Sequence, residues 1–318
     1  MRALITGVAG FAGGHLAEHL VAATDWEVWG NVRSAADASS VAQSVRTIIA
    51  DLRDPQSVVD LVDRSRPDFV FHLAAQAFVP QSWVAPWDTY EANLRSQINL
   101  FEALLKRGGA ARVLVIGSNE EYGKIEPAQL PVREDSPLRP DSPYGVSKIA
   151  QDFMGLQYFL SHRLPVVRVR PFNHIGPRQS EKFVASAFAK QIASIEARLI
   201  PPVIKVGNLS AQRDFTDVHD VARAYRLAVE QGEVGEVYNI GSGTPRKIQS
   251  LLDTLLGLSA EAIRVEVDPD RIRPSDTPIS YCDPSKFTAR TGWAPAIPIE
   301  QTLQDVLDDW RKRVTVNS

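Results

Sequence analysis

The stretch that decides the fold is Ala3-Leu4-Ile5-Thr6-Gly7-Val8-Ala9-Gly10-Phe11-Ala12-Gly13, at the start of the chain. Its apolar beginning predicts a short buried strand, and a helical pattern follows to about Ala23. Small residues between a strand and a helix let the backbone approach a pyrophosphate, which the free N–H groups of the helix N-terminus attract. A plain tight turn is the alternative, because the spacing differs from the commoner G-x-G-x-x-G fingerprint. The predicted dinucleotide site comprises Gly7, Gly10, Phe11, Ala12 and Gly13.

Strand and helix patterns alternate through the first half of the chain. This alternation predicts an α/β fold with a doubly wound parallel sheet, similar to a Rossmann fold. Right-handed crossovers then bring the carboxyl ends of the strands to one rim, where open α/β sheets bind ligands. The later strands are expected at about Glu27 to Val32, Thr47 to Ala50, Phe69 to Leu73, Val113 to Ile116 and Pro165 to Val169.

Residues at the predicted strand ends suggest which dinucleotide binds. Arg33 follows the second strand, where an arginine favours a 2′-phosphate and an acidic residue would favour a ribose hydroxyl. We therefore predict NADP(H), with NAD(H) as the alternative cofactor and a solvated surface arginine as the plain interpretation. Asp51, after the third strand, is placed to reach the adenine or to cap the next helix.

A long amphipathic helix is expected from Trp87 to Lys106. Asn93 lies on it and is predicted to be a buried polar group that needs a partner. The apolar stripe of this helix is predicted to be Leu94, Ile98, Phe101 and Leu105.

The segment Ser142-Pro143-Tyr144-Gly145-Val146-Ser147-Lys148 places a phenol and an amine one helical turn apart on one face. A phenol with a pKa near 10 transfers protons poorly at neutral pH, and a neighbouring ammonium stabilises its phenolate. Ser118, after the fifth strand, can hold the oxygen being protonated. Tyr-x-x-x-Lys alone occurs by chance in many helices, but this trio suits making or unmaking an alcohol beside a hydride carrier.

Composition excludes several other classes of protein. The 318 residues are 44% hydrophobic and 23% charged, as in an ordinary globular protein, and the net charge of -3 favours neither nucleic acid nor an anionic membrane as a partner. The single cysteine, Cys282, excludes an internal disulfide and a cysteine-based metal site, and no metal is predicted. Without a signal peptide or an apolar run of about 18 residues, we expect a cytoplasmic protein.

The alternation becomes irregular after Asn173. We interpret residues 1–172 plus about 213–242 as a dinucleotide-binding domain, and about 173–212 plus 243–318 as a smaller, discontinuous substrate lobe.

The motifs Thr6-Gly7-x-x-Gly10-Phe11-x-Gly13, Asp51-Leu52-x-Asp54, His72-Leu73-Ala74-Ala75, Ser118 and Tyr144-x-x-x-Lys148 occur in this order. Over essentially its whole length the chain resembles the extended short-chain dehydrogenase/reductase family. The resemblance implies NAD(P)-dependent chemistry on a nucleotide sugar, with Tyr144 as general acid/base, Lys148 tuning it and holding the nicotinamide ribose, and Ser118 bonding the reacting oxygen. Further predicted cofactor contacts are Arg33, Asp51, Leu52, Leu73, Ala74, Ala75, Asn93, Tyr144, Lys148 and Pro171.

A narrower resemblance rests on Arg170 to Pro177, Val206 to Leu209, Arg213 to Val218 and Arg273 to Asp276, which look like the GDP-mannose branch of that family. It implies a homodimer formed by helices at about 87–106 and 144–160. Lys190 as a solvated helix residue and Asn208 as a turn former are the plain alternatives. The residues implied to bind the GDP-linked 6-deoxy-hexose are Ser118, Asn173, Lys190, Asn208, Arg213 and Arg273.

Within that branch the motifs are most similar to the reductases of GDP-4-keto-6-deoxy-D-mannose, which implies NADPH-dependent reduction at C4 to GDP-D-rhamnose. Glu120 stands where the related 4,6-dehydratases have a catalytic carboxylate, so a GDP-mannose 4,6-dehydratase is the second hypothesis and a 4-epimerase the third. Asn119 replaces the serine more usual in that motif. A non-enzymatic NADP-binding regulator is a further hypothesis, which the intact Ser118, Tyr144 and Lys148 set disfavours.

Overall fold

The computed structural model describes residues 1–271 and 277–316. Its main feature is a seven-stranded sheet in the order β10-β6-β5-β4-β1-β2-β3, in which every neighbouring pair is parallel. This confirms the predicted α/β fold with a doubly wound parallel sheet. The strands are β1 (Arg2–Thr6), β2 (Glu27–Val32), β3 (Arg46–Ile49), β4 (Phe69–His72), β5 (Arg112–Ile116), β6 (Val166–Pro171) and β10 (Val237–Ile240).

Helices cover both faces of this sheet because its strands are apolar on both sides. Ala3 and Ile5 of β1 pack into one core, and Leu4 between them packs into the other. The first core is covered by α1 (Phe11–Ala23), α9 (Val218–Gln231) and α11 (Ser285–Thr291). The second is covered by α3 (Pro55–Ser65), α6 (Ser96–Lys106) and α7 (Pro143–His162). Shorter helices are α2 (Ala35–Ser39), α4 (Val79–Val84), α5 (Pro86–Tyr90), η2 (Asn119–Glu121), η3 (Pro127–Gln129) and η4 (Pro269–Arg271).

The strand order reverses between β1 and β4, which creates a crevice at their carboxyl ends. Thr6, the last residue of β1, bonds through Oγ1 with His72 Nδ1 at 2.9 Å and accepts the backbone N–H of Ala74 at 3.1 Å. These bonds hold the two strand ends together at the place where ligands bind in such sheets.

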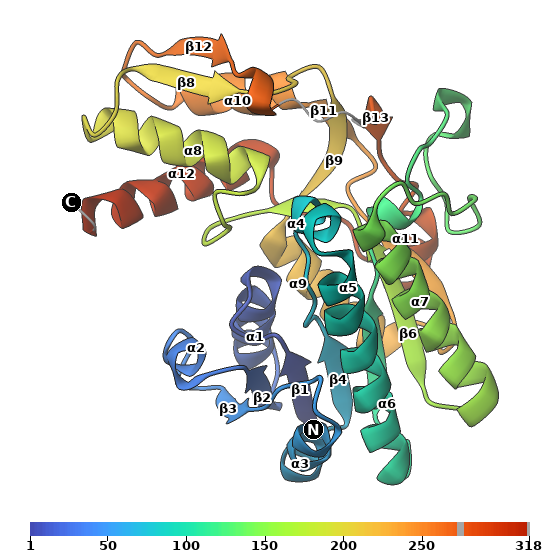
Figure 1. Ribbon diagram of the computed structural model, residues 1–318. Coiled ribbons are helices and arrows are strands. Elements are labelled where there is room, and N and C mark those ends of the chain that lie inside the picture. Colours follow the sequence, from blue (N-terminus) through green and yellow to red (C-terminus); the bar gives the residue numbers. More distant parts are fainter. Residues whose placement is uncertain (272–276, 317–318) are drawn as a thin grey trace.

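The smaller lobe lies beyond the carboxyl edge of the sheet, with α8 and α12 side by side (Figure 1). Its core is formed mainly by α8 (Val184–Glu196), α10 (Ile248–Gly257) and α12 (Ile299–Val316). Its strands form one small sheet of β7, β9, β11 and β13 and another of β8 and β12. They are β7 (Asn173–Ile175), β8 (Val203–Val206), β9 (Gln212–Asp217), β11 (Pro245–Lys247), β12 (Arg264–Val267) and β13 (Ile279–Ser280).

The chain crosses between the two lobes several times. β9 pairs within the smaller lobe, whereas Phe287 and Trp293 are buried in the core of the large sheet. The division near residues 173, 213 and 243 therefore stays an interpretation of where the substrate lobe begins and ends.

The predicted helix from Trp87 to Lys106 contains a π-helical segment, η1 (Glu91–Arg95), between α5 and α6. The prediction that Ile98 belongs to the buried stripe is wrong, because its side chain is 41% exposed. The wider turn of η1 changes which residues face inward. The buried side carries Asn93, Gln97, Leu100, Phe101 and Leu104. Among the described residues, no helix is both long and apolar enough to cross a membrane.

Candidate active site

The glycine-rich turn after β1 packs too closely to tolerate larger residues. Gly7 has a φ of 71°, and a Cβ there would meet the backbone of Ala74 at 3.0 Å. A Cβ on Gly13 would lie 2.3 Å from the carbonyl oxygen of Gly7. A cavity of about 150 Å³ lies beside the turn, lined in part by Gly10, Phe11 and Arg178. The glycines therefore let the turn pack against the backbone around it, and the cavity adjoins the start of α1, where a pyrophosphate would be attracted.

Two predicted contacts for the adenosine end lie beyond β2 and β3. The Arg33 side chain is 89% exposed, and its Nε lies 4.0 Å from Asp37, which is too far for a strong ion pair. The side chain can therefore turn towards a bound phosphate. Asp51 forms an ion pair with Arg53 at 2.8 Å. The alternative that Asp51 caps the next helix is wrong, since Asp54 accepts the backbone N–H groups of Gln56 and Ser57 at the start of α3.

Asn93 is fully buried and has the partners it needs. Its Oδ1 accepts the backbone N–H of Gln76 at 2.7 Å, and its Nδ2 donates to Ser147 Oγ at 2.9 Å. These bonds tie the loop that follows β4, which contains Leu73, Ala74 and Ala75, to α7. Pro171 ends β6 on the same rim and is buried.

Ser118, Tyr144 and Lys148 meet where β5 ends. Ser142 caps α7 by accepting the Gly145 N–H at 3.0 Å, which places Tyr144 in the first turn. Lys148 Nζ lies 5.8 Å from the centre of the Tyr144 ring and donates to the carbonyl oxygen of Ile116 at 2.9 Å. The Ser118 side chain lies near enough to the phenol of Tyr144 to lower its pKa. Residues from two distant stretches of the sequence thus form one polar cluster.

Burial dominates the acidity of this cluster. It lowers the pKa of Lys148 to about 8 and raises the pKa of Tyr144. The nearby Ser118 hydroxyl offsets part of the rise in the Tyr144 pKa. The expectation that the Lys148 ammonium makes this phenol more acidic than usual is wrong for this structure, because burial raises the Tyr144 pKa and Lys148 Nζ donates to the carbonyl oxygen of Ile116.

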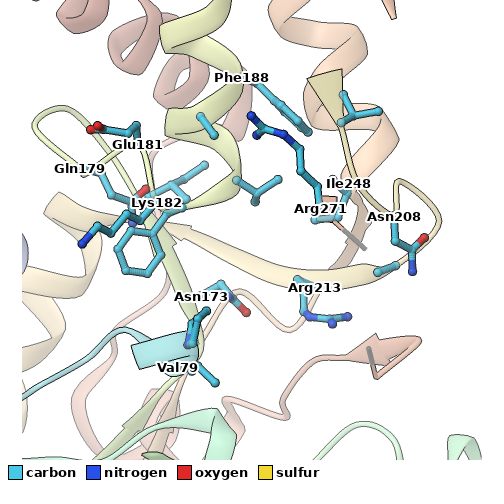
Figure 2. A pocket seen from close by; sticks show the side chains of 18 of the residues that line it. Val79, Asn173, Gln179, Glu181, Lys182, Phe188, Asn208, Arg213, Ile248 and Arg271 are labelled. Atoms are coloured by element: carbon cyan, nitrogen blue, oxygen red, sulfur yellow. The ribbon is translucent and has the colours of Figure 1, made fainter. Parts of the chain in front are cut away.

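A cavity of about 550 Å³ opens between β7, β9 and α8 (Figure 2). Ser118, Tyr144 and Lys148 are not among its described lining residues, and the cavity reaches this part of the site at the turn that follows Ser118. Glu120 lines it, as do three residues implied by the resemblance: Asn173, Asn208 and Arg213. His174 also lines it, stacks on Phe11 with ring centres 6.0 Å apart, and bonds through Nδ1 with the carbonyl oxygen of Phe172. Lining residues that sequence reasoning did not select include Lys182, Phe188, Lys205 and Arg271.

Two predicted substrate residues stand apart from these. Lys190 is not among the described lining residues: its Nζ lies 3.3 Å from Glu181 and 5.5 Å from the centre of the Trp310 ring. Arg273 lies outside the described residues. Arg271, two positions earlier, does line the cavity (Figure 2). The sequence indicated Arg271 only through its position two residues before the Arg273 motif.

A doubly wound sheet, a glycine turn at its rim and a Ser-Tyr-Lys trio beside a polar cavity together define an enzyme of the extended short-chain dehydrogenase/reductase class. Residues 4–306 match the sequence family described as GDP-mannose 4,6 dehydratase, which is one family of this class. The chain belongs to that family.

Relatives of known activity cover nearly the whole chain. It is 36% identical over 314 residues to a GDP-6-deoxy-D-mannose reductase of Pseudomonas aeruginosa, a match that covers 98% of each chain. It is 29% identical to GDP-mannose 4,6 dehydratase 2 of Arabidopsis thaliana, over 96% of this chain and 86% of the other.

Solved structures of related enzymes are also similar to this protein over nearly its whole length. RMD from Pseudomonas aeruginosa complexed with NADPH superposes with a TM-score of 0.88 at 35% identity, covering 98% of this chain and 100% of the other. A UDP-glucose 4-epimerase of Thermus thermophilus in complex with NAD superposes with a TM-score of 0.86 at 30% identity, covering 98% and 99%.

Proposed function

We propose that this protein reduces the C4 keto group of GDP-4-keto-6-deoxy-D-mannose to GDP-D-rhamnose, with NADPH as the hydride donor. The meeting of Ser118, Tyr144 and Lys148 beside the large cavity carries the proposal. The full-length similarity to a relative named GDP-6-deoxy-D-mannose reductase supports the choice of reaction.

The residues around the glycine turn fit NADP(H). Gly7 and Gly13 let the turn pack tightly against the backbone of Ala74 and Gly7, and the Arg33 side chain is exposed enough to meet a 2′-phosphate. Asp51, Leu52, Leu73, Ala74, Ala75, Asn93 and Pro171 would border the rest of the dinucleotide. When bound, NADPH supplies the hydride. The relative's structure with NADPH supports this cofactor over NAD(H).

The chain's own groups then handle the proton. The Tyr144 hydroxyl donates it to the oxygen that becomes an alkoxide at C4, and Ser118 holds that oxygen from the other side. Lys148 places a positive charge near both. Donors already in place where negative charge develops are the main source of rate acceleration in such sites.

The polar lining of the large cavity suits a nucleotide diphosphate. Arg213 donates to the carbonyl oxygens of Gln212 and Thr277, which hold its guanidinium in place. With Arg271, Lys182 and Lys205 it supplies the positive charge that phosphates require. The buried Oδ1 of Asn173 has no hydrogen-bond partner among the described residues, so it is placed to accept a bond from a substrate hydroxyl.

A GDP-mannose 4,6-dehydratase is the second candidate, because Glu120 lines the same cavity and is the right kind of base. Two assays separate the candidates. With the 4-keto sugar and NADPH, a reductase consumes one cofactor per product. With GDP-mannose and catalytic NADP⁺, a dehydratase accumulates a 4-keto sugar without net cofactor use. Activity in the second assay alone would overturn the proposal.

We also propose that the protein works as a homodimer. Val146, Phe153 and Leu160 recur every seven residues on α7 and are 44%, 51% and 58% exposed. An exposed apolar row of this length favours a second copy of the same helix as its partner. A cytoplasmic location agrees with the single cysteine, Cys282, which is buried and unpaired.

A further inference from the structure

Behind the catalytic trio lies a buried cluster of four charged side chains: Glu121, Asp152, Arg168 and Arg170. All are at least 94% buried, and Glu121 is completely so. Burying charge is costly unless each group is well paired, so such a cluster needs a reason.

Glu121 holds the turn that carries Ser118. Its Oε1 accepts the backbone N–H of Ser118 at 2.8 Å, while Ser118 Oγ accepts the N–H of Glu120 at 3.2 Å. Together these bonds form a capping box around η2. The backbone position of Ser118 therefore depends on the side chain of Glu121.

The other end of Glu121 contacts Arg170 on β6, which in turn contacts the helix that carries Tyr144 and Lys148. Its Oε2 lies 2.9 Å from Arg170 Nε. Arg170 donates through Nε to Asp152 Oδ2 at 2.7 Å, and its Nη2 lies 2.6 Å from the same oxygen. Asp152 is on α7, about two turns after Tyr144 and one turn after Lys148. A continuous set of contacts thus joins the Ser118 turn to α7.

The residue before Ser118 leaves room for this arrangement. A Cβ on Gly117 would lie 2.2 Å from Glu121 Oε1. Because that separation is far below any real contact, a side chain at position 117 and the observed placement of Glu121 exclude each other.

We propose that Glu121 is a positioning residue for the reaction: it sets the distance between Ser118 and Tyr144 by anchoring the Ser118 turn to α7 through Arg170 and Asp152. The proposal rests on the proposed function only in that Ser118 and Tyr144 act on the same substrate oxygen.

Burial raises the pKa of Glu121, whereas Arg170 and Arg168 hold the pKa of Asp152 below its usual range despite burial. A glutamine at position 121 keeps an acceptor for the Ser118 N–H. A leucine has a similar volume and offers no acceptor.

The test compares Glu121→Gln with Glu121→Leu. Turnover is measured at saturating NADPH with varied 4-keto sugar, and NADPH binding is measured by its fluorescence. We expect Glu121→Leu to lose about 100-fold in kcat, since a misplacement of about 1 Å costs that much. Its KM and its NADPH Kd stay within about threefold of wild type. Glu121→Gln restores kcat to within about threefold.

Asp220→Leu is the matched control. Asp220 is a buried carboxylate on α9 that accepts the N–H groups of Ala296 and Ile297, outside the site. This variant is expected to melt at a lower temperature while each folded molecule keeps wild-type kcat. The same result for Glu121→Leu would overturn the proposal, because a purely structural carboxylate gives that result.

If Glu121→Leu does not fold, Gly117→Ala serves instead, since it displaces Glu121 without removing it. A loss of tenfold or more in kcat is expected, and wild-type kcat would overturn the proposal. If the wild-type protein proves to be a dehydratase, the proposed function fails, but the same variants are compared in the GDP-mannose assay. There the leucine and glutamine variants must still differ.

Discussion

At the scale of single residues, Tyr144 has a buried phenol with the Ser118 hydroxyl nearby. General acid catalysis by such a group contributes roughly 10²- to 10⁴-fold to the rate. We therefore expect Tyr144→Phe to lose that factor in turnover while NADPH still binds. Tyr158→Phe, which removes another hydroxyl from α7, bonded to Glu102, is the control and should stay active. Near-full turnover by Tyr144→Phe would contradict the mechanism.

We expect Lys148 to make the rate of reduction depend on pH. Burial lowers its pKa to about 8, so the amine is charged below that pH and neutral above it. Since the charged form helps to stabilise an alkoxide, kcat for the reduction should fall as the pH rises through about 8. Lys148→Arg, whose side chain stays charged, should show no fall in that range even if its rate is lower throughout. A wild-type kcat that rises across pH 8 would refute this role.

Arg33 should set the cofactor preference. A hydrogen bond to a charged group contributes about 1.5–3 kcal/mol, which corresponds to roughly 10- to 100-fold in affinity. Arg33→Ala should weaken NADPH binding by that factor and leave NADH binding unchanged. Arg107→Ala, at another partly exposed arginine paired with Asp63, is the control. An unchanged ratio of the two affinities would remove Arg33 from the cofactor site.

At the scale of secondary-structure elements, α7 has two working faces. One carries Tyr144, Lys148 and Asp152 towards the sheet, and the other presents Val146, Phe153 and Leu160 to solvent. The Asn93–Ser147 bond and the Gln97–Gln151 bond of 3.0 Å fix how α7 lies against η1 and α6. Dimerisation on the exposed face would therefore support the site without taking part in it.

Phe153→Glu tests that exposed face. A carboxylate in the middle of an apolar helix contact must lose its hydration, so we expect the protein to sediment as a monomer instead of a dimer. Gln231→Glu, at an exposed residue that ends α9, changes the charge equally away from this face and should leave the dimer intact. Wild-type protein that sediments as a monomer at micromolar concentration would contradict the dimer proposal.

At the scale of the whole molecule, the large cavity is bordered by residues from both lobes. Arg271 lines it, whereas Lys190 is held against Trp310 and Glu181. We expect Arg271→Ala to raise the KM for the GDP-linked sugar by about tenfold, as loss of a charge-assisted bond to phosphate would. Lys190→Ala should change it by less than threefold. The reverse order of effects would show that the diphosphate binds on the α8 side instead.

The strand pattern, the glycine turn and the Tyr144–Lys148 spacing could all be predicted from the sequence, because each depends on neighbours a few residues away. A run of apolar residues determines a buried strand wherever it occurs, and four positions always make one helical turn. These local rules led to the parallel sheet, which the structure confirms, and to the proposed cofactor rim and catalytic trio.

Only the tertiary structure decided the rest. The inward face of α6 depended on η1 and on the partners of Asn93 and Gln97, and the acidity of Tyr144 depended on how much water its surroundings exclude. The cluster of Glu121, Asp152 and Arg170 joins η2, α7 and β6, which are far apart in the sequence. No spacing between residues could therefore predict it. Long charged side chains such as Lys190 and Arg271 reach whichever partner the fold brings near. Sequence alone therefore determined the scaffold and its chemistry, while packing between distant segments determined what surrounds them.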